Sequence, residues 1–149
     1  MGGSGWSYVV PYREDVGAAL EALRAEEFAA GHNWSPTDWD LPAPASPDDL
    51  WQNELYWEFM GTHGTHSVLD VNRVIDVGED HDFGTVRPLA ASVIREGFGS
   101  DRPSRADFDG MDFGTLDALD DALRWSGHCM VLYRDGIPHE IAFWGVSGD

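Results

Sequence analysis

The stretch His128-Cys-Met-Val-Leu-Tyr-Arg134, followed by Asp135-Gly136 and then Ile137-Pro-His-Glu-Ile-Ala-Phe-Trp144, predicts a β-hairpin. Both flanking runs are apolar and aromatic, and an Asp-Gly pair suits a two-residue turn with positive φ at both positions. Counting outward from the turn pairs Pro138 with Tyr133, so that the missing N–H of the proline would have pointed away from the hairpin. We therefore expect strand 137–144 to have no outer neighbour at Pro138, or a bulge there.

Two further strands are expected nearer the N-terminus. Residues 6–12 (Trp-Ser-Tyr-Val-Val-Pro-Tyr) are rich in β-forming residues and end at a proline. Residues 67–77 alternate apolar and polar side chains, which is typical of a half-buried strand. Together with the hairpin, these segments give a sheet of about four strands.

Helices are predicted from apolar spacing and from end signals. The predicted helices cover residues 14–30, 48–60, 88–96 and 115–125. The second helix begins after Ser46-Pro47 and is apolar nearly all round, so it is buried on several sides or uses one side on a partner. The order of elements predicts one α+β domain over residues 1–149: a largely antiparallel sheet with helices packed on one face and a C-terminal hairpin.

The chain contains no lysine. It has 27 Asp and Glu against nine Arg, which gives a formal charge of −18 over 149 residues, although the charged fraction of 24% is ordinary. Such a surface repels phosphate backbones and anionic lipid, and it attracts cations and basic proteins. We therefore expect neither nucleic acid nor membrane as a partner. GC-rich coding and adaptation to high salt are the ordinary explanations of absent lysine.

The composition also bounds the class of protein. With 42% hydrophobic residues and seven Trp, the chain has enough apolar surface to fold despite its charge. No apolar run approaches the ~20 residues that cross a bilayer, and the N-terminus lacks a secretory signal. The one cysteine, Cys129, excludes an internal disulfide. These features lead us to expect a cytoplasmic protein.

The best metal candidate is His63-Gly-Thr-His66 with Asp70, because two histidines and a carboxylate can bind zinc. On the predicted strand, however, His66 and Asp70 would lie about 13 Å apart at ~3.3 Å per residue. We therefore interpret the segment as a glycine turn entering a strand. The sequence assigns no metal ligand, cofactor or catalytic residue.

Two acidic segments, 79–82 and 107–112, resemble calcium loops, but neither has the ligand spacing, the central glycine and the closing Glu of such a loop. We interpret them as surface turns; a weak cation site in them stays open.

Cys129 follows His128, and adjacent strand residues point to opposite faces, so the two form no catalytic pair. Cys129 is therefore expected to be a small buried apolar residue.

The distribution of charge is more informative than any motif. Residues 25–72 contain no Arg or Lys, but they hold nine carboxylates and four Trp. Acids around exposed aromatic side chains suit the recognition of a basic surface, because charge speeds the encounter and aromatic anchors supply affinity. Any single Trp is more often part of the core, but we do not expect Trp34, Trp39 and Trp57 all to be buried. The candidate partner-binding residues are Trp34, Asp38, Trp39, Asp40, Asp48, Asp49 and Trp57.

Three stretches carry a resemblance to known sequences: Gly5-Trp-Ser-Tyr-Val-Val-Pro-Tyr12, Gly64-Thr-His-Ser-Val-Leu-Asp70 and Glu140-Ile-Ala-Phe-Trp-Gly-Val-Ser-Gly-Asp149. Together they resemble a set of small, uncharacterised acidic proteins of actinobacteria. The resemblance implies a GC-rich bacterial source, and with it the genomic explanation of absent lysine. It implies no activity, cofactor or catalytic residue.

The leading functional hypothesis is a non-enzymatic binding protein that engages a basic protein partner, as an immunity or antitoxin-type inhibitor does. One alternative is a small metal-dependent or hydrolytic enzyme that uses His63, His66 and nearby carboxylates. Another is a mimic of nucleic acid, which would present its carboxylates in regularly spaced rows.

Overall fold

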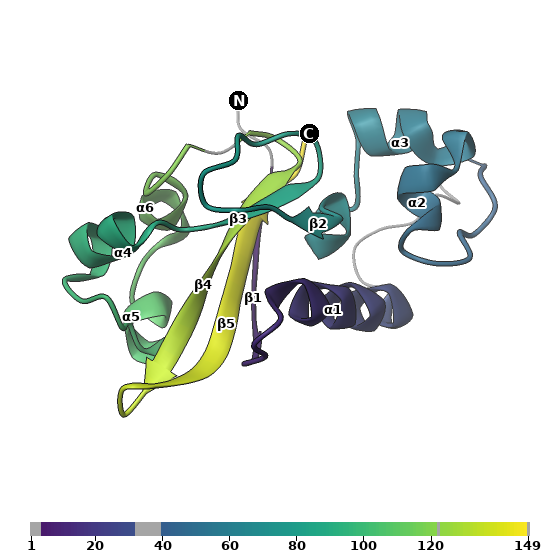
Figure 1. Cartoon of the computed structure of the whole chain (residues 1–149). Coiled ribbons are helices and arrows are strands. Elements are labelled where there is room, and N and C mark those ends of the chain that lie inside the picture. Colours follow the sequence, from purple (N-terminus) through teal and green to yellow (C-terminus); the bar gives the residue numbers. More distant parts are fainter. Residues whose placement is uncertain (1–3, 32–39, 122, 149) are drawn as a thin grey trace.

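The computed structural model describes residues 4–31, 40–121 and 123–148. Its centre is a five-stranded sheet in the order β1-β5-β4-β3-β2, with helices on either side (Figure 1). The elements are β1 (Gly5–Pro11), α1 (Val16–Ala30), α2 (Asp49–Gln52), the 3-10 turn η2 (Glu54–Tyr56), α3 (Trp57–Thr62), the 3-10 turn η3 (Val68–Asp70), β2 (Arg73–Val74), β3 (Thr85–Pro88), α4 (Ala91–Phe98), α5 (Arg105–Asp109), α6 (Phe113–Asp117), β4 (Ser126–Arg134) and β5 (Ile137–Val146).

The predicted C-terminal hairpin is confirmed as β4 and β5. Asp135 and Gly136 have φ values of 54° and 74°, as a two-residue turn of this kind requires. Tyr133 pairs with Pro138, and the register shifts between Leu132 and Tyr133, so that a bulge lies beside the proline. β1 pairs with β5 only from Glu140 onward, which also leaves Pro138 without an outer strand.

The sheet is mixed, which corrects the expectation of about four largely antiparallel strands. β1, β5 and β4 are antiparallel neighbours, but β3 runs parallel to β4, and β2 runs parallel to β3. The missed strand, β3, covers only four residues and ends at Pro88, where the sequence predicted the start of a helix. The helix in this region is α4, which ends before Gly99 in the left-handed conformation.

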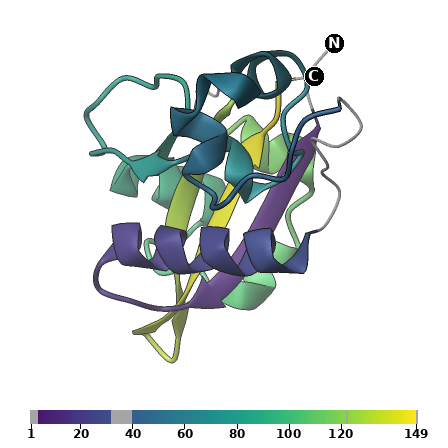
Figure 2. The same ribbon diagram turned by 90° about the vertical axis from the view of Figure 1, so that its right-hand side faces the viewer.

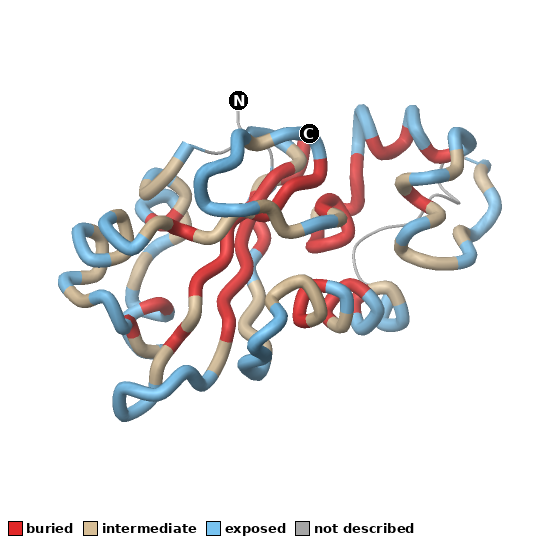
Figure 3. Tube along the Cα trace, viewed as in Figure 1, coloured by how far each residue is buried: buried red, intermediate tan, exposed pale blue. Residues whose placement is uncertain are grey.

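Helices cover both faces of the sheet, not one as predicted (Figures 1 and 2). On one face, α1 packs through Leu20 and Leu23 against Ile141 and Phe143 of β5. On the other face, residues of α4, α5 and α6 pack around Trp144. The hairpin is therefore buried along most of its length (Figure 3), because each strand face has a helical layer of its own.

The predicted strand over residues 67–77 is wrong except at Arg73 and Val74. Ser67 and Asp70 lie in a tight turn, η3, and only Arg73 and Val74 pair as β2. The Ser67 hydroxyl accepts from the Leu69 N–H (3.2 Å), and Asp70 is fully buried instead of facing solvent. Side-chain bonds to the backbone thus replace the strand that alternation predicted.

The helix predicted over residues 14–30 is confirmed as α1, with Asp15 as its N-cap and Gly31 as its C-cap. The helix predicted over residues 48–60 is interrupted at Asn53, whose backbone is extended and whose side chain accepts from the Leu55 N–H (3.0 Å). Asparagine is a strong capping residue, so it ends α2 and starts the next turn.

The apolar character of segment 48–60 comes from a third core beneath it. Leu50, Tyr56, Phe59 and Met60 are buried there with Leu69.

The helix predicted from Thr115 to Trp125 is reduced to α6, which Asp112 caps by accepting from the Thr115 N–H (2.9 Å).

Candidate functional site

An aromatic strip lies on the surface between α2–α3 and the loop that precedes β3. We define it as Trp51, Trp57, Phe83 and Trp125. Trp57 Nε1 donates to the Trp51 carbonyl (3.2 Å), the rings of Trp51 and Phe83 meet edge to face at 5.3 Å, and Phe83 stacks on Trp125 at 4.9 Å. Trp57 is 58% exposed and Phe83 is 42% exposed.

The strip is held in place from beneath. Trp51 Nε1 donates to the Leu69 carbonyl (2.9 Å), which ties the indole to the buried turn η3. Gly84, with φ of 88°, lets the chain pass directly under Trp51, since a Cβ there would come within 2.9 Å of the ring. The aromatic surface is therefore fixed by its support, so little conformational entropy would be lost on binding.

The two segments that lead into and carry most of the aromatic strip are rich in carboxylates. Residues 40–62 hold five Asp or Glu and residues 76–82 hold four, and neither segment has an Arg or Lys. We call these nine carboxylates the acidic rim: Asp40, Asp48, Asp49, Glu54, Glu58, Asp76, Glu79, Asp80 and Asp82. Three arginines border these nine carboxylates: Arg24 Nη1 donates to Asp48 (2.9 Å), Arg73 lies 3.8 Å from Asp82, and Arg87 Nη1 donates to the Glu79 carbonyl (3.0 Å). The rim therefore carries a strong local excess of negative charge.

The predicted partner-binding residues differ in their exposure and in their structural contacts. Trp57 and Asp40 are both exposed. Trp34, Asp38 and Trp39 lie outside the described residues. Asp48 and Asp49 are in the rim, but both have structural partners, so their replacement would disturb the fold as well as the surface.

Asp48 neutralises a buried arginine. Its carboxylate accepts from Arg24 Nη1 at 2.9 Å, and Glu21 accepts from the same atom at 3.2 Å, while the Arg24 side chain is only 1% exposed. Removing one partner of a buried ion pair leaves an uncompensated charge, which is strongly destabilising. Asp49 accepts from the Ala45 N–H (2.9 Å) and holds the loop before α2.

The His63–His66–Asp70 group does not converge on one point. The two rings meet edge to face with centroids 5.0 Å apart, but the Asp70 carboxylate is turned into the protein. It accepts from Thr65 N (2.7 Å), Thr65 Oγ1 (2.9 Å), His66 N (3.1 Å) and Ser147 Oγ (2.6 Å). Burial raises the pKa of Asp70, and these hydrogen bonds oppose that rise. Asp70 thus joins the turn to the C-terminal strand.

A polar network that the sequence did not predict lies at the start of β4. His128, 1% exposed, has its Nε2 3.2 Å from Asp120 Oδ2 and 3.1 Å from His81 Nε2. Arg87 Nη2 donates to the same Asp120 oxygen (2.8 Å). His81 and Arg87 come from one segment and Asp120 and His128 from another, 33 to 47 positions away across the contacts, so no local motif connects them.

The hydrogen-bond directions in this network fix the histidine tautomers. The Thr85 hydroxyl donates to the Asp82 carbonyl (2.9 Å), so it accepts from His81 Nδ1 (2.8 Å). His81 Nε2 is then an acceptor facing the Nε2–H of His128. Burial, followed by the charge of His81, lowers the pKa of His128 to about 4, so its imidazole is neutral at neutral pH.

The segments that resemble calcium loops are engaged in caps and turns. Asp107 and Ser104 form a reciprocal capping box at the start of α5, and Asp112 caps α6. Glu79 accepts from the Asp76 N–H (3.0 Å).

Among the described residues there is no group of three or more His, Cys, Asp or Glu that could hold a metal ion. Within the same residues, no helix is long and apolar enough to span a bilayer.

No protein-family model, curated protein or solved structure matches this chain. The resemblance to acidic actinobacterial proteins therefore stays an expectation, and function has to be argued from the surface itself.

Proposed function

We propose that this protein is a non-enzymatic binding protein whose aromatic strip and acidic rim engage a basic protein partner, in the manner of an immunity or antitoxin-type inhibitor. The observation that carries the proposal is the exposure of Trp57 and Phe83 on a fixed support, in segments of the chain that are rich in carboxylates. Tryptophan anchors of this kind provide most of the binding energy in protein interfaces, and the surrounding charge speeds association.

The location of the protein follows from the proposed mode of action. We place it in the cytoplasm, because its single cysteine, Cys129, is a free thiol and the cytoplasm keeps thiols reduced. A formal charge of −18 favours a partner of opposite charge and disfavours association with anionic lipid.

The test uses affinity purification from the source organism with paired variants. Trp57→Ala removes the exposed anchor, and Leu123→Ala is its control, because Leu123 is similarly exposed (54%) but lies outside the strip. We expect Trp57→Ala to abolish recovery of a basic protein that the wild type and Leu123→Ala both recover. The recovered protein is then purified, and its affinity is measured by calorimetry, where we expect a loss of at least about 2 kcal/mol for Trp57→Ala.

A second pair of variants tests the charge. Glu58→Arg with Asp80→Arg reverses two exposed rim residues whose carboxylates have no hydrogen-bond partner among the described residues, whereas Glu14→Arg with Glu96→Arg makes the same change of net charge elsewhere. The rim pair should slow association more than the control pair, with the difference decreasing as salt is added. Equal effects of the two pairs would refute a localised site. Competition by duplex DNA for the same partner would instead favour a nucleic-acid mimic.

A further inference from the structure

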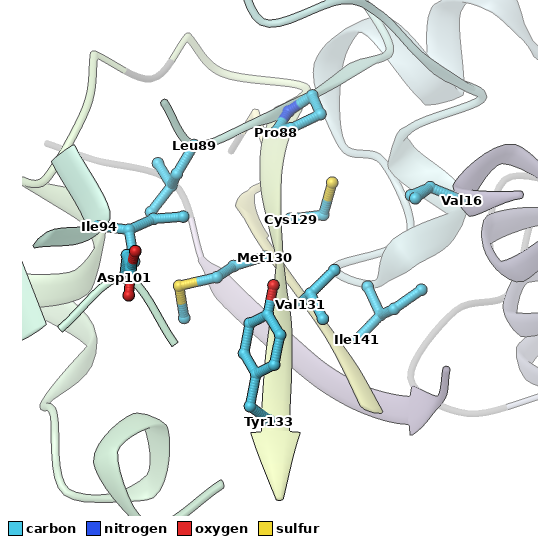
Figure 4. Close-up of a pocket in the computed structure, with 10 residues that line it drawn as sticks. All are labelled: Val16, Pro88, Leu89, Ile94, Asp101, Cys129, Met130, Val131, Tyr133 and Ile141. Atoms are coloured by element: carbon cyan, nitrogen blue, oxygen red, sulfur yellow. The ribbon is translucent and has the colours of Figure 1, made fainter. Parts of the chain in front are cut away.

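A cavity of about 160 Å³ opens at the outer edge of β4, away from the aromatic strip (Figure 4). β3 pairs with β4 only as far as Pro88 and Cys129, and the chain then turns away towards α4. Leu89 N donates to the Cys129 carbonyl (3.1 Å), and the next backbone bond on this edge joins Tyr133 N to the Pro103 carbonyl (2.8 Å). The cavity occupies the interval between these two bonds.

The walls of the cavity are apolar and come from both helical layers. Val16 of α1, Cys129 and Ile141 lie on one side of the sheet, and Ile94 of α4 and Met130 lie on the other (Figure 4). An apolar cavity of roughly 150 Å³ can hold a benzene molecule. The walls and the volume therefore suit an apolar group of about that size.

A few polar groups face this apolar space. Cys129 and Tyr133 direct their backbone groups to the outer edge, so Val131, midway between them, does the same. Within the described part of the chain, the Val131 N–H and carbonyl have no backbone partner on that edge. The Tyr133 hydroxyl points into the cavity, and Asp101 also lines it (Figure 4). Apolar walls with a small number of placed polar groups are typical of small-molecule sites.

The position in the fold also suits a ligand. In open sheets with helices on both faces, ligands bind beyond the carboxyl ends of strands, where successive connections leave to opposite faces. The cavity lies at the carboxyl end of β3, between α1 on one face and α4 on the other.

We propose that this cavity binds a small organic cation, with an apolar body about the size of benzene against β4 and a protonated amine at Asp101. Asp101 is the one ionisable carboxylate among the cavity-lining residues, and the strongly negative molecule attracts cations from a distance. The guanidinium of Arg102 does not line the cavity. It donates to the Gly136 carbonyl (3.1 Å) and lies 5.9 Å from the Tyr133 ring centroid, which holds that ring in place.

The site is suited to binding, not to covalent chemistry. Cys129 is the only cysteine of the chain, and burial raises the pKa of its thiol to about 12. The thiol therefore stays protonated at neutral pH and contributes an apolar surface.

The test compares three probes of one shape and different charge: benzylamine, benzyl alcohol and benzoate. Calorimetry measures their affinities, and backbone amide shifts locate the bound probe. We expect saturable binding in the order benzylamine, benzyl alcohol, benzoate, with shifts centred on residues 129–133 and 89–94. Asp101→Asn should weaken benzylamine binding about fivefold and leave benzyl alcohol unchanged, as expected for a partly exposed ion pair.

Two further variants make the test decisive. Asp135→Asn removes an exposed acid outside the cavity and should leave all three affinities unchanged. Val16→Phe should fill the cavity and abolish binding of every probe, and its folding is checked by the unchanged amide spectrum of the far end of the sheet. Equal affinity for the amine and the alcohol, or shifts elsewhere on the molecule, would overturn the proposal. This site is independent of the proposed partner surface, so either can fail alone.

Discussion

His128 shows how one buried side chain can make stability depend on pH. It is enclosed by Asp120, His81 and Trp144, and Arg87 adds a positive charge nearby. Protonation of His128 would add a proton at Nδ1 and place a positive charge in this buried site near Arg87. Protonation of His81 as well would set two N–H groups facing one another at the Nε2–Nε2 contact. Desolvation and this repulsion both favour the neutral imidazole.

We predict that the free energy of unfolding decreases as the pH falls from 6.5 to about 4. An unfolded histidine titrates near pH 6.5, whereas burial lowers the pKa of His128 to about 4, so the unfolded chain takes up the proton first. The contribution of neutral His128 is therefore complete above pH 6.5 and is lost through this interval, by about 3 kcal/mol. Urea unfolding at a series of pH values measures it.

The variant that isolates this effect is His128→Gln, which keeps a polar group but does not titrate. Subtracting its pH profile from that of the wild type also removes the contribution of the many surface carboxylates. His139→Gln, at an exposed histidine, should reproduce the wild-type profile. Parallel profiles for the wild type and His128→Gln would contradict the prediction.

At the scale of elements, the join between the hairpin and β1 depends on two facing glycines. Gly127 and Gly145 are paired across β4 and β5, and the indole of Trp6 from β1 lies over both. A Cβ on Gly145 would stand 2.5 Å from the Ser126 carbonyl oxygen and would also meet the Trp6 ring. An aromatic ring covering a strand glycine in this way protects the backbone and fixes the register.

Gly145→Ala should therefore lower the free energy of unfolding by about 3 kcal/mol, because neither the backbone carbonyl nor the enclosed indole can move aside. The matched control is Gly61→Ala in α3, where a Cβ meets nothing within 4 Å. That change should raise stability by about 0.5 kcal/mol, since alanine favours a helix. Chemical denaturation of both variants measures the difference. Similar stabilities for the two would show that the Trp6 contact is not close-packed.

At the scale of the whole molecule, the charge is carried mainly by exposed carboxylates, while the shielded ion pairs are few. Arg24–Asp48 and Arg87–Asp120 each have a largely buried arginine and are weakly screened by salt. The exposed carboxylates repel one another in the folded state more than in the extended chain.

We predict that added sodium chloride raises the melting temperature at pH 7, by about 3 °C for each 1 kcal/mol of repulsion removed. Potassium chloride should give the same increase at equal ionic strength, because screening does not depend on the identity of the cation. Differential scanning calorimetry from low to moderate salt provides the measurement. A flat response would mean that the charges are already well dispersed.

The local patterns of the sequence were sufficient for the hairpin 128–144, the strand 6–12 and the helix 14–30, because turn residues, alternation and caps act within a few positions. The same kind of evidence failed for residues 67–77, where hydrogen bonds of Ser67 and Asp70 outweigh alternation. It also missed β3, whose four residues pair only with neighbours distant in sequence. The sequence named Trp57 as one of three candidates for an exposed Trp, but it did not predict the contacts of Trp51 with Trp57 and Phe83.

The sequence by itself thus determined the net charge, the cation-free segment 25–72 and the elements that short-range interactions specify. Only the tertiary structure decided the mixed sheet, the His81–His128–Asp120 network, the aromatic strip and the cavity at the edge of β4. Each of these joins residues tens of positions apart, whose contact depends on how complete elements pack on one another. The periodicity of a single segment cannot predict such a contact, because the contact forms only when distant elements have packed together in the complete fold.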